Sequence, residues 1–254
     1  MKLMSYNILD GGKERLPLII EVIKKEAPDY LTINEANTFA ENDSAILKQI
    51  AEEIGFPYYD ISLSGEYDYH VAVFSKYPFL SINKLQPLMR ACIVALVETE
   101  LGKISIASLH LTPYSENQRH PEINLILDFQ KQYKNRVLMG DMNSLSKYDD
   151  YNHKIIEGFD EIQTKKFTTD GQLRFDAINK MMAVGYVDSA LIMKRNKDAT
   201  APTSLNDYLS QTPMRLDYIF ISPSLLSHHA HYSVIKNDLT HKASDHFPII
   251  VELK

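Results

Sequence analysis

The chain has 254 residues, of which 44% are hydrophobic and 24% are charged, and its formal net charge is −6. This length and composition are typical of a globular protein that buries one substantial core. The acidic balance argues against a protein that clamps long duplex DNA non-specifically, because such proteins usually present a strongly basic surface.

The cysteine content and the N-terminus bear on the cellular compartment. Cys92 is the only cysteine, so the chain forms no internal disulfide and does not need an oxidising compartment to fold. It lies in the apolar run Ala91–Val97, which predicts a buried structural thiol. The first residues lack the apolar segment of a signal peptide, and no apolar stretch is long enough to span a bilayer. We therefore expect a cytoplasmic protein without stable membrane insertion.

Helix and strand patterns alternate in the first quarter of the chain. The predicted elements are a strand at 2–7, a helix at 14–25, a strand at 29–33 and a helix at 45–54. Both helices carry apolar residues at the spacing of one helical face. Pro28 ends the first helix, and Gly55 with Pro57 ends the second. Each strand runs into polar residues at its end.

The remainder of the chain is richer in strands. We predict strands at 71–75, 92–99, 103–109, 136–139, 216–221, 231–236 and 247–253, and helices at 116–133 and 176–184. Gly102 marks a tight hairpin between two of these strands. The stretch from 146 to 213 is polar and less regular. Since no linker or repeat interrupts the pattern, we expect one mixed α/β domain over residues 1–254.

Several apolar strands end in, or are followed by, polar residues of the types that bind metal ions or phosphate. These residues are Asn7, Glu35, His110, Asp141 with Asn143, Asp217, and Asp245 with His246. Each alone is a weak signal, because a single such residue usually lies in a solvated loop or a turn. Strand ends that converge on one edge of a sheet are where such sites form.

As a set, these side chains suit the hydrolysis of a phosphoester. Mg²⁺ prefers carboxylate and amide oxygens, which Glu35, Asp245 and Asn7 supply. The reaction also needs an aligned water and groups that stabilise the phosphoryl oxygens, and the histidines, Asp141 and Asn143 are suitable. The sequence has neither a cysteine cluster for structural zinc nor the glycine-rich phosphate loop of an NTPase. The residues therefore predict a metal-dependent phosphoesterase.

The chain resembles the endonuclease/exonuclease/phosphatase superfamily in six short blocks that occur in the family's order. The blocks are Ser5–Leu9, Ile33–Glu35, Ser108–His110, Gly140–Ser144, Arg215–Phe220 and Ser244–Ile249. Together they extend over essentially the whole chain. The resemblance implies a four-layer α/β/β/α sandwich, in which two packed, mainly antiparallel mixed β-sheets are flanked by helices.

The resemblance also implies a role for each residue of the metal and water sites. Glu35 would be the principal Mg²⁺ ligand, with Asn7 close beside it and Asp245 helping to hold the ion; Mn²⁺ is the expected substitute. Asp141 would orient or deprotonate the attacking water. Asn143 would hold that water or a phosphate oxygen.

The same resemblance assigns the groups around the phosphoryl oxygens. His246 and His110 would stabilise the phosphoryl group, and Asp217 would fix the tautomer of His246 and stabilise its protonated form. Arg90 would lie near a substrate phosphate, the alternative being a solvated surface residue. Whether Asp141 or His246 is the general base stays open.

The substrate class is less determined than the reaction class. His110 occupies a block position at which apurinic-site endonucleases carry Tyr, and the chain has no tryptophan, so abasic-site repair is disfavoured. We favour an endo- or exonuclease that cleaves a phosphodiester in nucleic acid. The alternative is a phosphatase or phosphodiesterase for a small metabolite or a lipid headgroup. An inactive binding domain is least favoured, because no catalytic position is replaced.

Two further groups of residues have two interpretations each. Asp68 and His70 either reach the rim of the active site and support His110, or form a hairpin loop, which is the favoured interpretation. The basic residues of the 146–213 stretch either line the rim of the site or form a solvated surface, and we favour the surface. They are Lys165, Lys166, Arg174, Lys194, Arg195 and Lys197.

Overall fold

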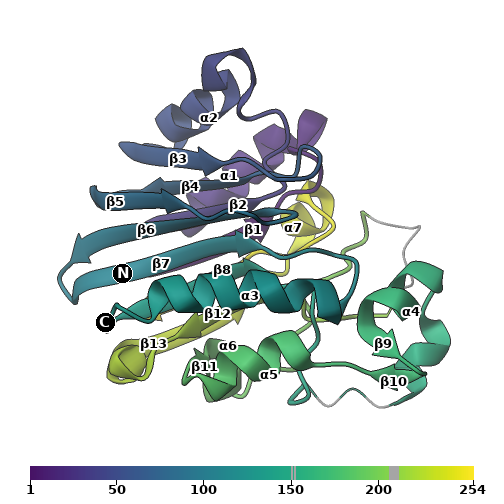
Figure 1. Ribbon diagram of the computed structural model, residues 1–254. Coiled ribbons are helices and arrows are strands. Elements are labelled where there is room, and N and C mark those ends of the chain that lie inside the picture. The colour runs from purple at the N-terminus through teal and green to yellow at the C-terminus, as the bar shows by residue number, and fades with distance from the viewer. Residues whose placement is uncertain (150, 152, 206–211) are drawn as a thin grey trace.

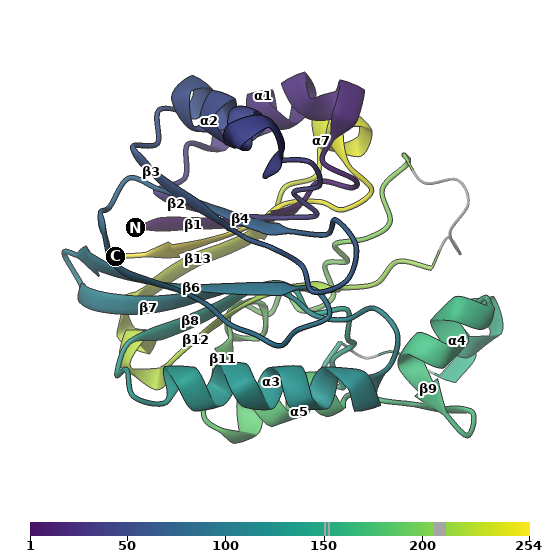
Figure 2. The same cartoon turned by 45° about the horizontal axis from the view of Figure 1, so that its top comes forward.

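The computed structural model describes residues 1–149, 151, 153–205 and 212–254. Within these residues, two six-stranded β-sheets pack face to face, and helices cover both outer faces (Figures 1 and 2). This is the four-layer sandwich that the resemblance implied. None of the described helices is long and apolar enough to cross a membrane.

The first sheet contains both ends of the chain. Its order is β13-β14-β1-β2-β4-β3. The strands are β1 (Lys2–Asn7), β2 (Tyr30–Asn34), β3 (Tyr58–Ser62), β4 (Val71–Ser75), β13 (His229–Val234) and β14 (Ile249–Leu253). Only the β1–β2 pair in this sheet is parallel, so β1 and β2 end at the same edge.

The second sheet has the order β11-β12-β8-β7-β6-β5. Its strands are β5 (Phe79–Lys84), β6 (Ala91–Thr99), β7 (Gly102–His110), β8 (Arg136–Asp141), β11 (Val187–Asp188) and β12 (Asp217–Ile221). The predicted hairpin joins β6 and β7 at Gly102. The β7–β8 pair is parallel and its other pairs are antiparallel. Each sheet is therefore mixed but mainly antiparallel.

Helices form the two outer layers. The first sheet is covered by α1 (Leu16–Glu26), α2 (Glu41–Ile54) and α7 (Asp238–Ala243), and the second by α3 (Glu116–Gln130) and α5 (Asp176–Ala183) (Figure 2). The short helix α6 (Ser189–Ile192) follows β11 directly. Short 3₁₀ helices occur at Lys13–Arg15, His153–Gly158 and Pro223–His228. Helix α4 (Glu161–Phe167) and the small β9 (Thr168–Thr169) and β10 (Gln172–Leu173) pair lie to one side (Figures 1 and 2).

Burial of apolar side chains explains the layering. The core between the sheets includes fully buried Leu3, Val73, Ile93, Ile219 and Val251. Alternate residues of the same strands face outward and pack under the helices, forming one apolar cluster on each side. Cys92 belongs to the cluster beneath α3 and is buried, as predicted.

The structure adds elements that we did not predict. Strands β3 and β5 lie at the ends of the two sheet orders. Edge strands keep solvent-exposed side chains, such as Tyr58 and Leu80, so they lack a clean buried pattern. The irregular 146–213 stretch contains α4, β9, β10, β11 and α6, all short; residues 150, 152 and 206–211 of this stretch lie outside the described residues.

Candidate active site

Strand register brings most of the candidate side chains to one edge of the sandwich. In the second sheet, Asp141 at the end of β8 pairs with both His110 and Asp217. His110 in turn pairs with Ala91, the neighbour of Arg90. In the first sheet Asn7 is opposite Asn34, which precedes Glu35. Because parallel strands end together and antiparallel partners begin where those strands end, residues far apart in sequence converge here.

Hydrogen bonds from Asn7 tie the ends of the two sheets together. Its Nδ2 donates to Glu35 Oε1 over 3.2 Å and to Asp141 Oδ2 over 3.1 Å. The buried Ser244 hydroxyl donates to the Asn7 carbonyl over 2.7 Å, which holds the segment before His246 against β1. The predicted metal-ligand position Asn7 therefore touches both the predicted principal ligand and the predicted water-orienting group.

A second amide, Asn34, makes a further bridge that the sequence analysis did not identify. Its Oδ1 accepts from the Asp141 backbone N–H over 3.2 Å, and its Nδ2 donates to the Leu109 carbonyl over 2.9 Å. A buried amide inside an apolar strand, as in Ile33-Asn34-Glu35, is the signal that could have indicated it, because a buried polar group needs partners.

Glu35 is held in an uncommon backbone conformation. Its φ is +58°, in the left-handed region that non-glycine residues seldom adopt and that often marks functional positions. Its Oε2 accepts from the Asp10 backbone N–H over 3.0 Å. Burial, followed by the negative charge of Asp245, raises the pKa of Glu35 to about 7, although its hydrogen bonds favour the charged form. A nearby cation would remove that penalty.

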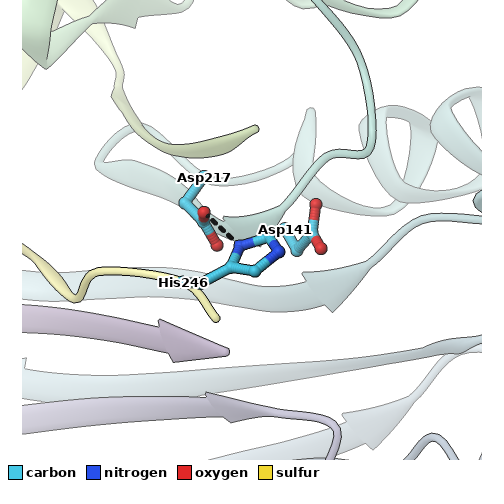
Figure 3. A group of neighbouring side chains, drawn as sticks. All are labelled: Asp141, Asp217 and His246. Carbon is cyan, nitrogen blue, oxygen red and sulfur yellow. Dashed lines mark hydrogen bonds and ion pairs between the residues drawn. The ribbon is translucent and has the colours of Figure 1, made fainter. Parts of the chain in front are cut away.

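His246 and Asp217 form a buried dyad. Nδ1 of His246 lies 2.7 Å from Asp217 Oδ2, and the imidazole ring lies between Asp217 and Asp141 (Figure 3). Burial opposes the charged form of the ring. The carboxylates of Asp217, Asp245 and Asp141 outweigh it, and together they raise the pKa of His246 to about 10. The ring is therefore an imidazolium at neutral pH.

Asp141 is surrounded by donors. Its Oδ1 accepts from the Asn143 backbone N–H over 2.8 Å, and Nε2 of His110 lies 3.6 Å from its Oδ2. Burial raises the pKa of Asp141, but the neighbouring His110 and His246 rings, the Lys166 ammonium and the Asn143 hydrogen bond together bring it below the ordinary value. Asp141 is therefore a carboxylate at neutral pH, beside the imidazolium.

His110 differs from His246 because it is buried without a close counter-ion bond. Burial lowers its pKa to about 3 despite the proximity of Asp141, so the ring is neutral at ordinary pH. Its Nδ1 has no hydrogen-bond partner within the described part of the chain. A neutral imidazole at this place can donate a hydrogen bond without adding a charge.

Asn143 is fixed on all sides. Its φ is +49°, its Nδ2 donates to the Leu111 carbonyl over 2.9 Å, and its Oδ1 accepts from Nζ of Lys166. Lys166 is a residue that we assigned to the solvated surface, and the structure corrects that assignment. The other basic residues of the stretch that show ion pairs, Lys165, Arg174 and Arg195, each bind a neighbouring acid away from the site.

Carboxylates and imidazoles are dense enough here to hold a cation. Ligand atoms of Asp141, Asp217 and His246 lie within 4.8 Å of one another. Glu35, Asn7 and Asp245 offer the oxygen donors that a hard divalent ion prefers. Burial and then the negative charge of Asp245 raise the pKa of Glu35, and two acids that oppose each other's ionisation fit a cation-binding site.

Arg90 lies in an aromatic cleft beside this edge. Only 6% of the residue is exposed, and its guanidinium lies 3.7 Å from the ring centroid of Tyr69. Two of its nitrogens, Nε and Nη1, have no hydrogen-bond partner among the described residues. Tyr67, Tyr114, Asn37 and Asp68 complete the lining of a cleft of about 600 Å³. Arg90 is thus a buried cation facing a cavity and not a solvated surface residue.

Asp68 and His70 are close to this cleft but do not support His110. His70 Nε2 pairs with Asp68 Oδ1 over 2.7 Å, and His70 Nδ1 accepts from the Ser64 backbone N–H. Asp68 also accepts from the Thr38 backbone N–H over 2.8 Å. Both ring nitrogens of His70 are therefore occupied, and the pair orders the loop before β4, as the hairpin-loop interpretation expects. Asp68 nevertheless also lines the cleft beside the catalytic side chains.

Comparison with known proteins identifies the family. The family model described as "Endonuclease/Exonuclease/phosphatase family" matches residues 4–246. No curated protein matches the chain. Several solved structures share the fold, and the alignment with each structure named here covers 100% of this chain. They include a family member from Leptotrichia buccalis C-1013-b (19% identity, TM-score 0.71, 99% of that chain covered) and an AP endonuclease from Archaeoglobus fulgidus (19%, 0.75, 99%).

A third similar structure is the 3′ phosphatase NExo from Neisseria bound to a product DNA hairpin, with 17% identity, a TM-score of 0.70 and 99% of that chain covered. At these identities the likeness shows the fold, whereas the family model rests on the sequence itself. With six blocks in order and the strand register that brings them together, the chain belongs to the endonuclease/exonuclease/phosphatase family and is a phosphoric ester hydrolase.

Proposed function

We propose that the protein is a Mg²⁺-dependent nuclease that hydrolyses a phosphodiester in nucleic acid by attack of a water molecule. The observation that carries this proposal is the position of Glu35, Asp141 and the Asp217–His246 dyad at one edge, where Asn7 bonds to Glu35 and Asp141 and the dyad lies beside Asp141. This combines an oxygen-rich cation site with an anionic carboxylate and an imidazolium, which together serve hydrolysis at phosphorus.

Glu35, Asn7 and Asp245 would hold the ion, with Mn²⁺ as the substitute. When bound, the ion supplies charge neutralisation and polarises a phosphoryl oxygen. We prefer this set to the Asp141–Asp217–His246 group. His246 there is engaged with Asp217 and carries a pKa of about 10, and a protonated imidazole has no lone pair for a metal ion.

The protonation states of Asp141 and His246 support one assignment of the acid–base roles. Asp141 is ionised at neutral pH because its pKa lies below the ordinary value, so it is available to orient the attacking water and accept its proton. His246 already carries its proton and therefore acts as a hydrogen-bond donor to the phosphoryl group, with Asp217 holding the ring. Asn143 and neutral His110 would donate further hydrogen bonds to the phosphoryl oxygens.

The aromatic cleft supports a nucleic-acid substrate over a small phosphoester. Tyr67 is 73% exposed and Tyr114 39% exposed, and bases stack on such rings irrespective of sequence. Arg90 would contact a backbone phosphate from the same cleft. Two similar structures, an AP endonuclease and a 3′ phosphatase bound to a DNA hairpin, are consistent with this choice. A cleft of this kind suits a short or single-stranded segment, which does not demand a basic net charge.

A substrate panel tests the proposal. Purified protein with Mg²⁺ is assayed on plasmid DNA, a single-stranded oligonucleotide, RNA, bis-para-nitrophenyl phosphate, sphingomyelin and inositol phosphates. We expect cleavage of nucleic acid and of the synthetic diester, loss of activity in excess EDTA and recovery with Mg²⁺ or Mn²⁺. Preferential turnover of sphingomyelin or an inositol phosphate would replace the nuclease by the small-molecule or lipid alternative.

Variants in the aromatic cleft distinguish a nucleic-acid substrate from a small phosphoester more sharply. The double variant Tyr67→Ala/Tyr114→Ala should lower kcat/KM on the oligonucleotide at least about tenfold more than on bis-para-nitrophenyl phosphate, since loss of one stacked base costs about 1–3 kcal/mol. Leu226→Ala removes an exposed apolar side chain elsewhere and serves as the control. Equal losses on both substrates would contradict a base-stacking role.

A further inference from the structure

Two adjacent lysines on α4 have opposite environments. Lys165 is 73% exposed and pairs with Glu161 over 2.7 Å in solvent. Lys166 points the other way, and its Nζ contacts Oδ1 of Asn143, a residue two positions from Asp141. A cationic side chain from a segment outside the four layers thus reaches the catalytic edge, which is the edge of the sandwich where the candidate catalytic side chains converge.

The position of Lys166 is fixed by its surroundings. Its backbone carbonyl accepts a hydrogen bond of 2.7 Å from Nη2 of Arg119, which is fully buried and also donates to the Thr112 carbonyl over 2.9 Å. The next residue, Phe167, is buried in an apolar cluster with Met214 and Leu216. The backbone is therefore anchored on both sides, so that the side chain reaches Asn143 without a large loss of conformational freedom.

The electrostatic surroundings point to an anionic ligand. Burial lowers the pKa of Lys166 to about 8, the charge of Arg119 acts in the same direction, and Asp141, Glu35 and Asp217 oppose both. The ammonium has three N–H groups, of which Asn143 accepts one. Lys166 also lines a cavity of about 140 Å³ together with Asp245 and His246, so the cation and the imidazolium face the same space.

We propose that Lys166 is a catalytic residue that donates a hydrogen bond to a non-bridging oxygen of the phosphoryl group and stabilises the charge that develops there. This inference rests on the proposed hydrolysis at this site. Lys166 stays protonated throughout, so it forms and breaks no covalent bond. Its contribution is electrostatic, as for other preorganised donors aimed at a developing charge.

The test compares Lys166→Met with Lys165→Met, which removes a lysine of the same helix that faces solvent. On bis-para-nitrophenyl phosphate with Mg²⁺, Lys166→Met should lower kcat by about 10²–10³-fold, the usual effect of deleting one such donor. Lys165→Met should stay within about twofold of the wild-type protein. Thermal melting of both variants checks that the fold persists. Equal activity of the two variants would overturn the proposal.

A double-mutant cycle distinguishes direct contact of Lys166 with the phosphoryl group from a role in which Lys166 only positions Asn143. If Lys166 touches the phosphoryl group, Asn143→Ala/Lys166→Met should lose more activity than Asn143→Ala, because two donors to the phosphoryl group are removed. A double variant no worse than Asn143→Ala would reduce Lys166 to a support for that amide and overturn the catalytic assignment.

Binding of inorganic phosphate gives a readout that does not depend on turnover. Calorimetric titration of phosphate in the presence of Mg²⁺ should show at least about tenfold weaker binding for Lys166→Met than for the wild-type protein and Lys165→Met. Unchanged or undetectable binding in all three proteins would overturn the proposal. The proposed function fails separately, if the wild-type protein hydrolyses no phosphoester with Mg²⁺ or Mn²⁺.

Discussion

Single side chains in this site obtain their chemistry from burial and from one or two charged neighbours. His246 and His110 have the same imidazole, but the carboxylate of Asp217 raises the pKa of the first to about 10, and burial lowers that of the second to about 3. One ring is a cation and the other is neutral at pH 7. In the proposed mechanism the two rings would therefore donate different kinds of hydrogen bond to the phosphoryl group, one charged and one neutral.

Replacing the partner of His246 tests this difference. In Asp217→Asn the pKa of His246, followed by NMR titration, should fall from about 10 toward its ordinary 6.5, and kcat at pH 8 should fall by about 10²-fold or more. The raised pKa means that the charged ring stabilises the fold fully below pH 6.5, and that this contribution is lost as the pH rises through about 10.

Asp68→Asn is the matched control, because Asp68 pairs with His70 over the same 2.7 Å outside the catalytic edge. On bis-para-nitrophenyl phosphate we expect it to keep wild-type turnover. A His246 pKa near 10 in Asp217→Asn would show that Asp217 does not hold the charge.

Pairs of strands place these side chains, and the β7–β8 pair has no room for a side chain at one of its positions. Gly140 in β8 is opposite Leu109 in β7 and has φ +142°, and a Cβ added to it would lie 1.8 Å from the Leu109 carbonyl oxygen. No side chain fits there. The glycine allows β8 to approach β7 closely enough for Asp141 to reach His110 and the Asn34 amide.

Gly140→Ala should therefore disturb both stability and catalysis. We compare it with Gly102→Ala, since Gly102 also has positive φ (+84°) but has open space around its Cβ position. Gly102→Ala should cost about 1 kcal/mol of unfolding free energy from backbone strain alone. Gly140→Ala should cost about 3 kcal/mol or more in urea unfolding and lower kcat as Asp141 shifts. Equal losses of unfolding free energy in the two variants would mean that β7 can shift to make room for the added methyl group at no extra cost.

The sandwich as a whole closes around a cluster of acids that repel one another without a cation. Glu35 comes from the first sheet and Asp141 from the second, and Asn7 bonds to both. Ionisation of Glu35 in the metal-free fold is opposed by burial and by Asp245. Packing of the two sheets therefore holds these repelling acids together in the folded state.

Metal binding and stability should accordingly depend on pH. With its pKa raised to about 7, Glu35 makes the metal-free fold lose stability as the pH rises from about 4.5 to about 7. Mg²⁺ binds the ionised form, so the Mg²⁺-induced rise in Tm should be larger at pH 8 than at pH 5.5. Differential scanning calorimetry with EDTA or Mg²⁺ measures it. In Glu35→Gln the difference between the Mg²⁺-induced rises in Tm at pH 8 and pH 5.5 should disappear, and its persistence there would exclude Glu35 as the ligand.

Local patterns were sufficient for the buried elements and for the reaction class. The apolar strands 2–7, 71–75 and 103–109 and the helix at 176–184 were predicted because burial of most of a strand, or of one face of a helix, imposes a recognisable apolar pattern. The edge strands β3 and β5 were not predicted, because some of their side chains face solvent and their apolar pattern is therefore incomplete. The six blocks predicted the candidate catalytic residues, because each hydrolytic role demands a particular residue type at a strand end.

Contacts between distant segments of the chain became known only from the folded structure. Two contacts have no periodic or spacing signal in the sequence. The bridge of Asn34 to Asp141 joins residues 107 positions apart, and the contact of Lys166 with Asn143 joins residues 23 positions apart. The same holds for the charge of His246, which depends on carboxylates that three other segments bring near it. Residue types define which chemistry is available, whereas pKa values and hydrogen-bond partners depend on burial and distance, which exist only after the two sheets have packed.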